Sequence, residues 1–417
     1  MVPRVDISLR IKKKQAQDPK MSYLKHLLLL PTLLVLASCS FFGSGDLDLT
    51  EPVDLENFDE QIRINRVWRH DIGKGPGDIH PVVYPAIDGN QLFVGDHAGQ
   101  VTAIDLTTGR RLWRAEIDDV EITGATGAGG DIVVVGTNEG EVIALSQADG
   151  SELWRTKVSS EVLTAPATNG NVVVVVSVDG KVRGLSATDG SEMWLADSIL
   201  PLLSVRGNAP PLIVSSLPGP NFAGLPVVFI AQDSGKVAAY SLRDGIQIWE
   251  ARVAVPEGQT DLERMVDIDG IPLYHSGSLY AVSYQGGLMA INPLNGQPVW
   301  FQDASSNVGP SAFAGSLVIT QDDGTVKAFN ASAGSEFWST DEYAYRGLNQ
   351  SVTTSNYVVF ADFEGYLHFL SRRTGQTVGR IKVDGSGVRS PTMLYNDHFI
   401  VLDNSGDISA YSVTELD

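Results

Sequence analysis

The sequence predicts an all-β protein, an eight-bladed β-propeller of four-stranded antiparallel blades. Two regularities support this prediction. The chain has seven tryptophans, and they recur at intervals of roughly forty residues, which is the repeat length of a propeller blade. A glycine in a predicted turn stands fourteen residues before each of the last six tryptophans. The tryptophans are Trp68, Trp113, Trp154, Trp194, Trp249, Trp300 and Trp338, and the glycines are Gly99, Gly140, Gly180, Gly235, Gly286 and Gly324.

One repeat shows the expected strands in order. A β-branched run at 132–135, an alternating segment at 141–146 and the residues that end at Trp154 are separated by turns rich in Gly, Asp and Ser. This composition is typical of short antiparallel strands joined by hairpins. Each blade therefore carries its tryptophan on the last, outer strand. We expect the indole ring to pack between neighbouring blades, where its N–H needs a partner.

The end of the repeat series indicates how the ring closes. Two more turn glycines, Gly365 and Gly406, bring the number of repeats to eight. Fourteen residues after Gly365 stands Gly379, a repeat that has lost its tryptophan, and the eighth repeat has no Trp-bearing strand before Asp417. The segment 66–69 can supply that strand. Pairing an N-terminal strand with the C-terminal blade removes the unpaired edges that an open sheet would present.

Composition narrows the classes of partner. The formal net charge is −20, which disfavours nucleic acid and anionic lipid surfaces, because both require basic protein surfaces. The chain has one cysteine, so it forms no intrachain disulfide and no cysteine-based metal site.

Residues 1–38 predict a basic leader followed by a lipoprotein signal peptide. Lysines and arginines dominate the residues before Met21, which is an alternative start, and an apolar run follows at 27–36. This run is too short to span a bilayer as a stable helix and is typical of a secretory signal. Its end, Leu-Ala-Ser-Cys, resembles the bacterial lipobox, in which the cysteine is acylated after the leader is removed. Cys39 is therefore the predicted lipidation site.

The residues after the signal divide into two parts. Residues 39–60 contain glycine, serine, proline and several acidic side chains, which predicts a lipidated flexible tether. Ser40, rather than Asp, follows the lipobox cysteine, and in lipoproteins this pattern indicates sorting to the outer membrane. Residues 61–417 make up the predicted propeller.

Two repeats are longer than the others. The intervals from Trp194 to Trp249 and from Trp249 to Trp300 are 55 and 51 residues, against 38 to 45 elsewhere. Extra residues in a propeller repeat form loops on a rim, which is often the binding face. The first insertion, 199–211, contains Leu203, Val205 and Arg206 in a proline-bounded loop. An apolar loop with one arginine indicates a docking surface; alternatively its aliphatic side chains fold back and plug the rim.

The second insertion belongs to the next blade, so the two can meet in space. It contains Asp267 and Asp269, which either pair with Arg206 or present carboxylates to a partner. The order Asp-x-Asp-Gly has a weak likeness to a calcium loop, but the third acid and the distant glutamate of an EF-hand are missing.

The repeat at 103–113, Ala-x-Asp-x-x-Thr-Gly-x-x-x-Trp, is similar to the tryptophan motif of quinoprotein propellers, which bind PQQ. The chain as a whole resembles the BamB family, the propeller lipoproteins of the outer-membrane β-barrel assembly machinery. The resemblance lies in the lipobox, the acidic tether, the eight repeats and the two insertions. The resemblance covers essentially the whole mature chain, and its most specific parts are 201–207, 263–269 and 362–367.

The resemblance implies a non-catalytic scaffold lipoprotein on the periplasmic side of the outer membrane, within the Bam complex. It implies docking on the periplasmic POTRA domains of BamA, and it allows unfolded outer-membrane proteins as further partners through β-augmentation. The sequence departs from the family at Val205, where leucine is more usual, and at 208–211. The family's docking positions fall on Leu203, Val205, Arg206, Asp267 and Asp269.

Two other functions are compatible with a propeller of this kind. Quinoprotein dehydrogenases share the blade motif, but they hold PQQ against a vicinal disulfide, which the single Cys39 excludes. The histidines have no metal-ligand spacing, no hydrolase or nucleotide-binding motif occurs, and the acid pairs 118–119 and 322–323 are interpreted as solvated turn residues. The sequence therefore predicts no catalytic, cofactor or metal site and no enzyme. The other alternative is a periplasmic binding propeller with an unassigned ligand.

Overall fold

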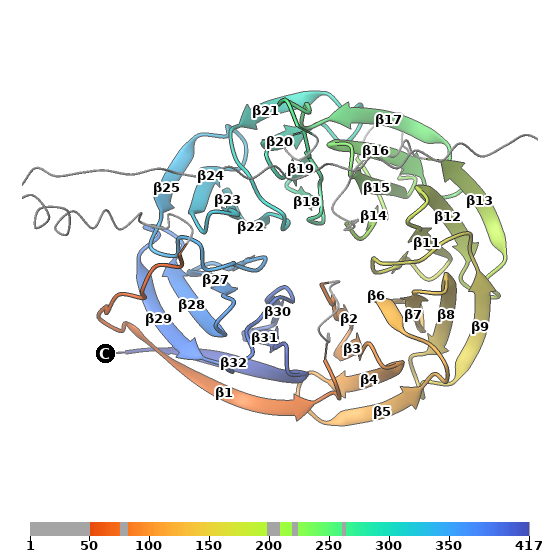
Figure 1. Ribbon diagram of the computed structural model, residues 1–417, viewed down its shortest axis with the longest axis horizontal. Coiled ribbons are helices and arrows are strands. Elements are labelled where there is room, and N and C mark those ends of the chain that lie inside the picture. The colour runs from red at the N-terminus through yellow and green to blue at the C-terminus, as the bar shows by residue number, and fades with distance from the viewer. Residues whose placement is uncertain (1–50, 76–81, 198–208, 219–223, 261–263, 417) are drawn as a thin grey trace, which may run out of the picture. The chain divides into compact units, whose positions relative to one another are not determined.

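The computed structural model describes residues 51–75, 82–197, 209–218, 224–260 and 264–416. Eight four-stranded antiparallel sheets stand in a ring around a central axis (Figure 1). Every regular element among these residues is a strand, which confirms the predicted eight-bladed β-propeller. The first strand of each blade lies nearest the centre and the fourth lies on the outside (Figure 1). In this part of the chain no helix is long and apolar enough to cross a membrane.

The blades follow the chain in order. Blade 1 contains β2 (Ala86–Asp88), β3 (Gln91–Gly95), β4 (Gln100–Asp105) and β5 (Arg111–Glu116). Blade 2 contains β6 (Ile122–Gly129), β7 (Ile132–Thr137), β8 (Glu141–Ser146) and β9 (Glu152–Lys157). Blade 3 contains β10 (Ala167–Thr168), β11 (Val172–Val176), β12 (Lys181–Ser186) and β13 (Glu192–Asp197). Blade 4 contains β14 (Leu212–Val214), β15 (Val227–Gln232), β16 (Lys236–Ser241) and β17 (Gln247–Arg252).

The second half of the ring repeats the pattern. Blade 5 contains β18 (Leu273–His275), β19 (Ser278–Val282), β20 (Leu288–Ile291) and β21 (Pro298–Gln302). Blade 6 contains β22 (Ser311–Phe313), β23 (Ser316–Thr320), β24 (Val326–Asn330) and β25 (Glu336–Thr340). Blade 7 contains β26 (Val352–Thr353), β27 (Tyr357–Ala361), β28 (Tyr366–Ser371) and β29 (Thr377–Lys382). Blade 8 contains β30 (Met393–Tyr395), β31 (His398–Leu402), β32 (Asp407–Glu415) and, as its outer strand, β1 (Ile62–Asp71).

The N-terminal strand closes the ring as predicted. Strand β1 pairs antiparallel with β32, with Ile62 opposite Glu415 and Asp71 opposite Asp407. A bulge between Arg66 and Trp68 shifts the register within this pair. The first and last strands of the described chain therefore share one sheet, and neither leaves an open blade.

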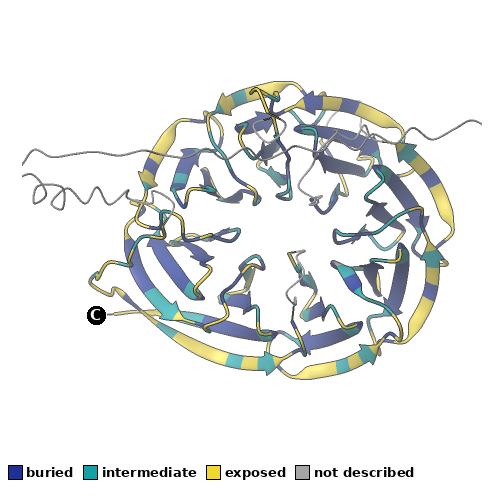
Figure 2. Ribbon diagram, in the orientation of Figure 1, coloured by how far each residue is buried: buried dark blue, intermediate teal, exposed yellow. Residues whose placement is uncertain are grey.

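Burial follows the position of a strand within its blade. The second strands are buried on both faces, because each blade is packed between two others; all five valines of β11 are buried. Such strands become continuous β-branched runs rather than alternating ones. The outer strands alternate between exposed and buried residues, and Figure 2 shows them as the mostly exposed circumference of a buried interior.

The tryptophans join neighbouring blades at seven of the eight junctions in the ring. Trp154 on β9 donates its indole N–H to the carbonyl of Ala187, at 2.9 Å, in the turn between the third and fourth strands of blade 3. We call this turn, which every blade from 1 to 7 has, the docking turn. All seven tryptophans donate in this way, over 2.7–3.3 Å, to the carbonyls of Leu106, Gln147, Ala187, Leu242, Pro293, Ala331 and Arg372.

The missing eighth tryptophan has a structural explanation. Blade 8 has no docking turn, because its third strand, β32, ends near the C-terminus and its fourth strand, β1, comes from the N-terminus. A tryptophan at position 379 on β29 would have no turn carbonyl to bond. Ile62 occupies that place instead, so close that a Cβ on Gly379 would lie 2.5 Å from Ile62 Cγ1.

The residues just before β1 also contact the ring. The backbone N–H of Val53 donates to Ala344 O at 3.1 Å, and Arg346 Nη1 donates to Val53 O at 2.9 Å. Arg346 is buried, and its Nε donates to Asp362 Oδ2 at 2.8 Å. Farther along, the Arg380 guanidinium lies 5.0 Å from the centre of the Phe58 ring. The last part of the expected tether therefore lies along blades 6 and 7.

The docking turn requires a glycine, and substitution of that glycine tests the requirement. Gly150, in the docking turn of blade 2, has φ +77°, and a Cβ there would lie 2.6 Å from Trp113 Cε3. We expect Gly150→Ala to lower the free energy of unfolding by about 1–2 kcal/mol for the left-handed backbone and by about 1–3 kcal/mol more for the overpacked indole. Denaturant unfolding followed by tryptophan fluorescence measures the sum.

Gly89→Ala is the matched control, because Gly89 has φ +60° and open space around the added Cβ. This substitution adds only the cost of a left-handed backbone conformation, because no atom crowds the new methyl group. Equal losses for the two variants would show that the contact with the indole ring contributes nothing.

Candidate partner-binding surface

The structure describes one half of the predicted docking surface. Leu203, Val205 and Arg206, in the first insertion, lie outside the described residues, so their predicted role stays a prediction. Asp267 and Asp269, in the second insertion, are described and lie in the connection from β17 of blade 4 to β18 of blade 5.

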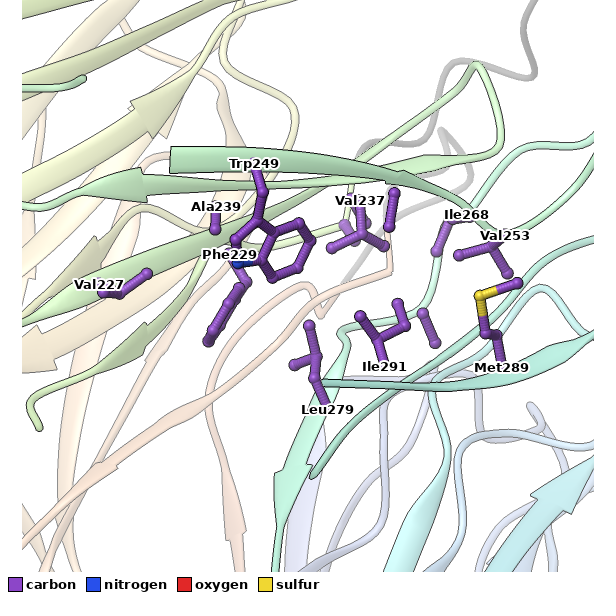
Figure 3. Packing of buried hydrophobic residues seen from close by; sticks show 14 of the residues in the cluster. Val227, Phe229, Val237, Ala239, Trp249, Val253, Ile268, Leu279, Met289 and Ile291 are labelled. Carbon is purple, nitrogen blue, oxygen red and sulfur yellow. The ribbon is translucent and has the colours of Figure 1, made fainter. Parts of the chain in front are cut away.

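Apolar side chains hold this connection against the ring. Val266 and Ile268 are buried, and Ile268 belongs to the core cluster formed between blades 4 and 5. Figure 3 shows Ile268 beside Val253, with Trp249 and Met289 in the same cluster. Tyr284 N also donates to the carbonyl of Asp267 at 2.9 Å. The backbone that carries both aspartates is therefore fixed by packing and by a hydrogen bond.

The two aspartates differ in accessibility. Asp267 is 1% exposed, whereas Asp269 keeps part of its surface. Asp269 Oδ1 is buried and has no hydrogen-bond partner in the described part of the chain. Of the two described site residues, Asp269 is thus the one that a partner can reach.

Further carboxylates act on Asp269 from neighbouring blades. Asp233 lies in the turn between β15 and β16, and Asp322 lies in the turn after β23. Burial raises the pKa of Asp269 to about 8, and the negative charges of Asp267, Asp233 and Asp322 add to the increase. A guanidinium or ammonium group placed beside Asp269 would reverse this effect, because an opposite charge favours the ionised carboxylate. The rim is therefore suited to a cationic side chain.

Sequence reasoning missed Asp233 and misjudged Asp322. The expectation of solvated turn acids holds at Asp118, Asp119 and Asp323, which are exposed, but Asp322 is half-buried and hydrogen-bonded. Asp322 accepts hydrogen bonds from Ser305 Oγ at 2.6 Å and from Asn307 N at 2.9 Å, and burial raises its pKa. The available signal was its position two residues before the blade-turn glycine Gly324, which places it on the rim that carries the insertions.

The chemistry of this surface is binding chemistry. Among the described residues, no group of three or more His, Cys, Asp or Glu side chains could hold a metal ion. The acids gather around a loop whose backbone is fixed, and their charges favour a positively charged group. Such an arrangement suits recognition of another macromolecule.

Comparisons with known proteins match this chain over most of its length. A family model described as outer membrane protein assembly factor BamB matches residues 61–125, 97–340 and 322–417. The chain is 40% identical to the outer membrane protein assembly factor BamB of Pseudomonas aeruginosa over 389 residues, which cover 93% of this chain and 99% of that protein.

Solved structures give the same result for the fold. The crystal structure of BamB from Moraxella catarrhalis superposes with a TM-score of 0.75 at 25% identity, covering 84% of this chain and 100% of that one. The quinohemoprotein alcohol dehydrogenase of Comamonas testosteroni gives a TM-score of 0.61 at 14% identity, over 84% and 76% of the two chains. At this identity the second likeness shows the fold alone.

The raised pKa of Asp269 predicts a pH-dependent loss of stability. Between pH 4 and pH 8 this carboxyl keeps its proton in the folded state but loses it in the unfolded state, so stability falls as pH rises through this range. We expect Asp269→Asn to remove this dependence, so that its Tm rises relative to wild type from pH 4 to pH 8. Thermal unfolding followed by circular dichroism measures the difference.

Asp244→Asn serves as the control, because its effect on Tm should change with pH in the opposite direction. Hydrogen bonds, above all to Ser241, lower the pKa of Asp244, so its ionised form is the one that favours folding. A constant Tm difference between Asp269→Asn and wild type over the whole pH range would contradict the acidic environment described here.

Proposed function

This chain belongs to the family of the outer membrane protein assembly factor BamB, and from that membership we propose that it is a non-catalytic scaffold lipoprotein of outer-membrane protein assembly. It works at the outer membrane, on the periplasmic side, held by acylated Cys39 and the tether that follows. Its principal partner is the POTRA region of BamA within the Bam complex. The observation that carries the proposal is the fixed acidic loop at 264–270, which offers Asp269 to a cationic partner.

The proposed docking surface combines two insertions from neighbouring blades. Leu203 and Val205 supply apolar contacts, and Arg206 is the charged anchor. Asp269 completes the surface, and the buried Asp267 beneath it adds negative charge. Because Trp249 docks blade 4 on blade 5, the base of the second insertion is rigid. A preorganised surface loses less conformational entropy on binding than a flexible loop does.

The circumference of the ring suggests how client strands bind. On the outer strands, the residue directly before each tryptophan is apolar and 37–53% exposed: Val67, Leu112, Leu153, Met193, Ile248, Val299 and Phe337. These strands are also the outer edges of their sheets, where backbone groups are available for pairing.

Blade 7 provides an internal precedent for such binding. There the equivalent residue, Val378, is 5% exposed, and the chain's own N-terminal segment lies beside it, with Gln61 N donating to Val378 O at 2.9 Å. We propose that unfolded outer-membrane protein strands add to the other outer edges in the same way, by β-augmentation.

The two alternatives have less support. The dehydrogenase-like function lacks the second cysteine that a vicinal disulfide requires, because Cys39 is the only one. A binding propeller that uses its centre would not depend on the insertions. Deleting residues 199–211 separates this alternative from a BamA scaffold, which must lose its partner.

The docking proposal predicts the effect of removing Arg206. In a detergent pull-down with the lipidated protein, wild type should retain BamA, and Arg206→Ala should weaken binding by about 2 kcal/mol, or roughly thirtyfold in Kd. Asp269→Ala should also raise the Kd for BamA. Surface plasmon resonance with immobilised POTRA domains gives the affinities.

Arg243→Ala is the matched control, since Arg243 is exposed in the docking turn of blade 4. It should leave BamA binding unchanged. If Arg206→Ala binds BamA as wild type does, the docking surface lies elsewhere on the propeller.

The client proposal predicts a separate defect. We expect Leu153→Lys with Met193→Lys to reduce cross-linking of an unfolded outer-membrane protein to blades 2 and 3, because charges replace exposed apolar contacts. Tm should stay unchanged, since both side chains are about half exposed. BamA binding should also persist. Undiminished cross-linking would exclude this part of the circumference as the client site.

A further inference from the structure

Two open depressions meet on one rim of the ring, at blades 6, 7 and 8, which follow one another around the axis (Figure 1). One, of about 480 Å³, is lined mainly by the hairpins that join the first and second strands of these blades. The other, of about 550 Å³, lies where β28 and β29 of blade 7 face β1 and β32. Asn356, Tyr357 and Glu415 line both depressions, so the two form one continuous groove. We call it the hairpin groove.

The hairpin groove lies on the rim opposite to the acidic loop at 264–270. Neighbouring strands of a blade are antiparallel, so the hairpin after the first strand and the docking turn after the third emerge on one rim. The turn after the second strand and the connection to the next blade emerge on the other rim, and Asp322 and Asp269 lie in these segments. A partner in the hairpin groove therefore leaves the proposed BamA surface free.

Aromatic and aliphatic side chains form the floor of the hairpin groove. Phe399 is 4% exposed and packs edge-on against Phe369, with ring centres 5.1 Å apart. Tyr357 packs edge-on against the same ring. Phe313 on blade 6 and Leu394 on blade 8 are 40% and 38% exposed. A fixed apolar floor between exposed apolar side chains is typical of a site that binds a side chain of a partner.

Arg372 fixes the blade 6 side of the groove. Its guanidinium lies 5.7 Å from the centre of the Phe313 ring. Its Nε donates to Ser355 O at 2.8 Å, and its Nη1 donates to Ser316 Oγ at 2.8 Å. This arginine of blade 7 therefore joins the hairpins of blades 6 and 7 and restrains the Phe313 ring. A restrained side chain loses little conformational entropy when a partner binds.

Among the described residues that line the groove, the charged ones are all acidic: Glu60, Asp397 and Glu415. All three are exposed, and none has an ion pair within the described part of the chain. Burial raises the pKa of Tyr357, and the charge of Glu415 raises it further, so this carboxylate acts on the aromatic floor. The groove thus combines an apolar floor with a negative field.

This combination favours one class of occupant. Unpaired acids beside an apolar floor attract a chain that carries lysine or arginine next to an apolar side chain, because charge and packing are then satisfied together. Anionic lipids and nucleic acids would be repelled by the carboxylates. A second copy of this chain would bring its own net charge of −20. A small cation would use the acids but would not require Phe313 and Leu394.

We propose that the hairpin groove binds a basic, partly apolar peptide segment of another protein. An apolar side chain of the segment lies on the floor between Phe313 and Leu394, and a lysine or arginine lies beside Glu415. The propeller then holds two partners at once, one on each rim. This inference goes beyond the BamA surface proposed above and does not depend on it, because the two rims carry separate residues.

A photoreactive peptide tests the groove directly. The probe is a short peptide of alternating leucine and lysine with p-benzoylphenylalanine at its centre, and the protein is the lipidated chain in dodecyl maltoside. After photolysis, mass spectrometry of the digested protein should find cross-links at residues 354–357 and 394–415. A peptide with glutamate in place of lysine, or with serine in place of leucine, should not cross-link there. Equal yields at these residues for all three peptides would overturn the proposal.

Charge reversal tests the acids. Asp397→Lys with Glu415→Lys should lower the yield of groove cross-links by about tenfold. Asp118→Lys with Glu139→Lys is the matched control, because it changes net charge equally at exposed acids on the opposite rim, and it should leave the yield unchanged. Equal losses in the two variants would show that net charge alone attracts the peptide, and the groove would then have no role.

The apolar contact has its own test. Leu394→Ser should lower the yield of groove cross-links severalfold, whereas Ile246→Ser, at an exposed apolar residue of blade 4, should not. Thermal unfolding checks the fold of each variant. If the double lysine variant fails to fold, Asp397→Asn with Glu415→Gln takes its place and should give a smaller loss.

The remaining outcomes identify a different occupant or site. Cross-links confined to the outer strands would mean that the peptide binds by edge pairing, so the groove inference would be wrong while the client proposal would stand. A dimer detected by light scattering that Leu394→Ser converts to monomer would identify a second copy as the occupant and would overturn the proposal. BamA should still bind Asp397→Lys with Glu415→Lys, and its loss would show that the two rims are not independent.

Discussion

The hydrogen bond from each tryptophan indole to a docking-turn carbonyl is the constraint on which the ring depends. A four-stranded blade is apolar on both faces, so it is stable only when packed between two others. The indole fixes how far one blade is turned against the next, because its N–H and its ring both contact a single turn. Insertions outside that turn, such as those before blades 4 and 5, therefore lengthen the rim without altering the ring.

Closure is the one place where this rule fails, and the exception explains several features together. Blade 8 takes its outer strand from the N-terminus and so lacks a docking turn, and Ile62 fills the position that a tryptophan on β29 would occupy. The segment before β1 is held by Arg346 and Arg380 along blades 6 and 7. Ring closure and the course of residues 53–61 are thus one structural arrangement.

Electrostatics divides the surface into regions that net charge does not reveal. Acids from blade 4, from blade 6 and from the connection between blades 4 and 5 act on Asp269, although Asp233 and Asp322 stand 36 and 53 residues from it in the sequence.

The sequence by itself determined the all-β class, the eight blades, the outer position of the tryptophans and the pairing of β1 with the last blade. Each of these follows from a local repeat of strand, turn and tryptophan, which one sequence can display. It also singled out Asp267 and Asp269 through the length of one repeat. Only the tertiary structure decided that Asp267 is buried while Asp269 keeps part of its surface, that Asp322 is half-buried and hydrogen-bonded, and that residues before β1 lie along blades 6 and 7. The physical reason is that burial and electrostatic fields depend on distances between blades, and the ring brings together residues whose separation in the chain has no simple period.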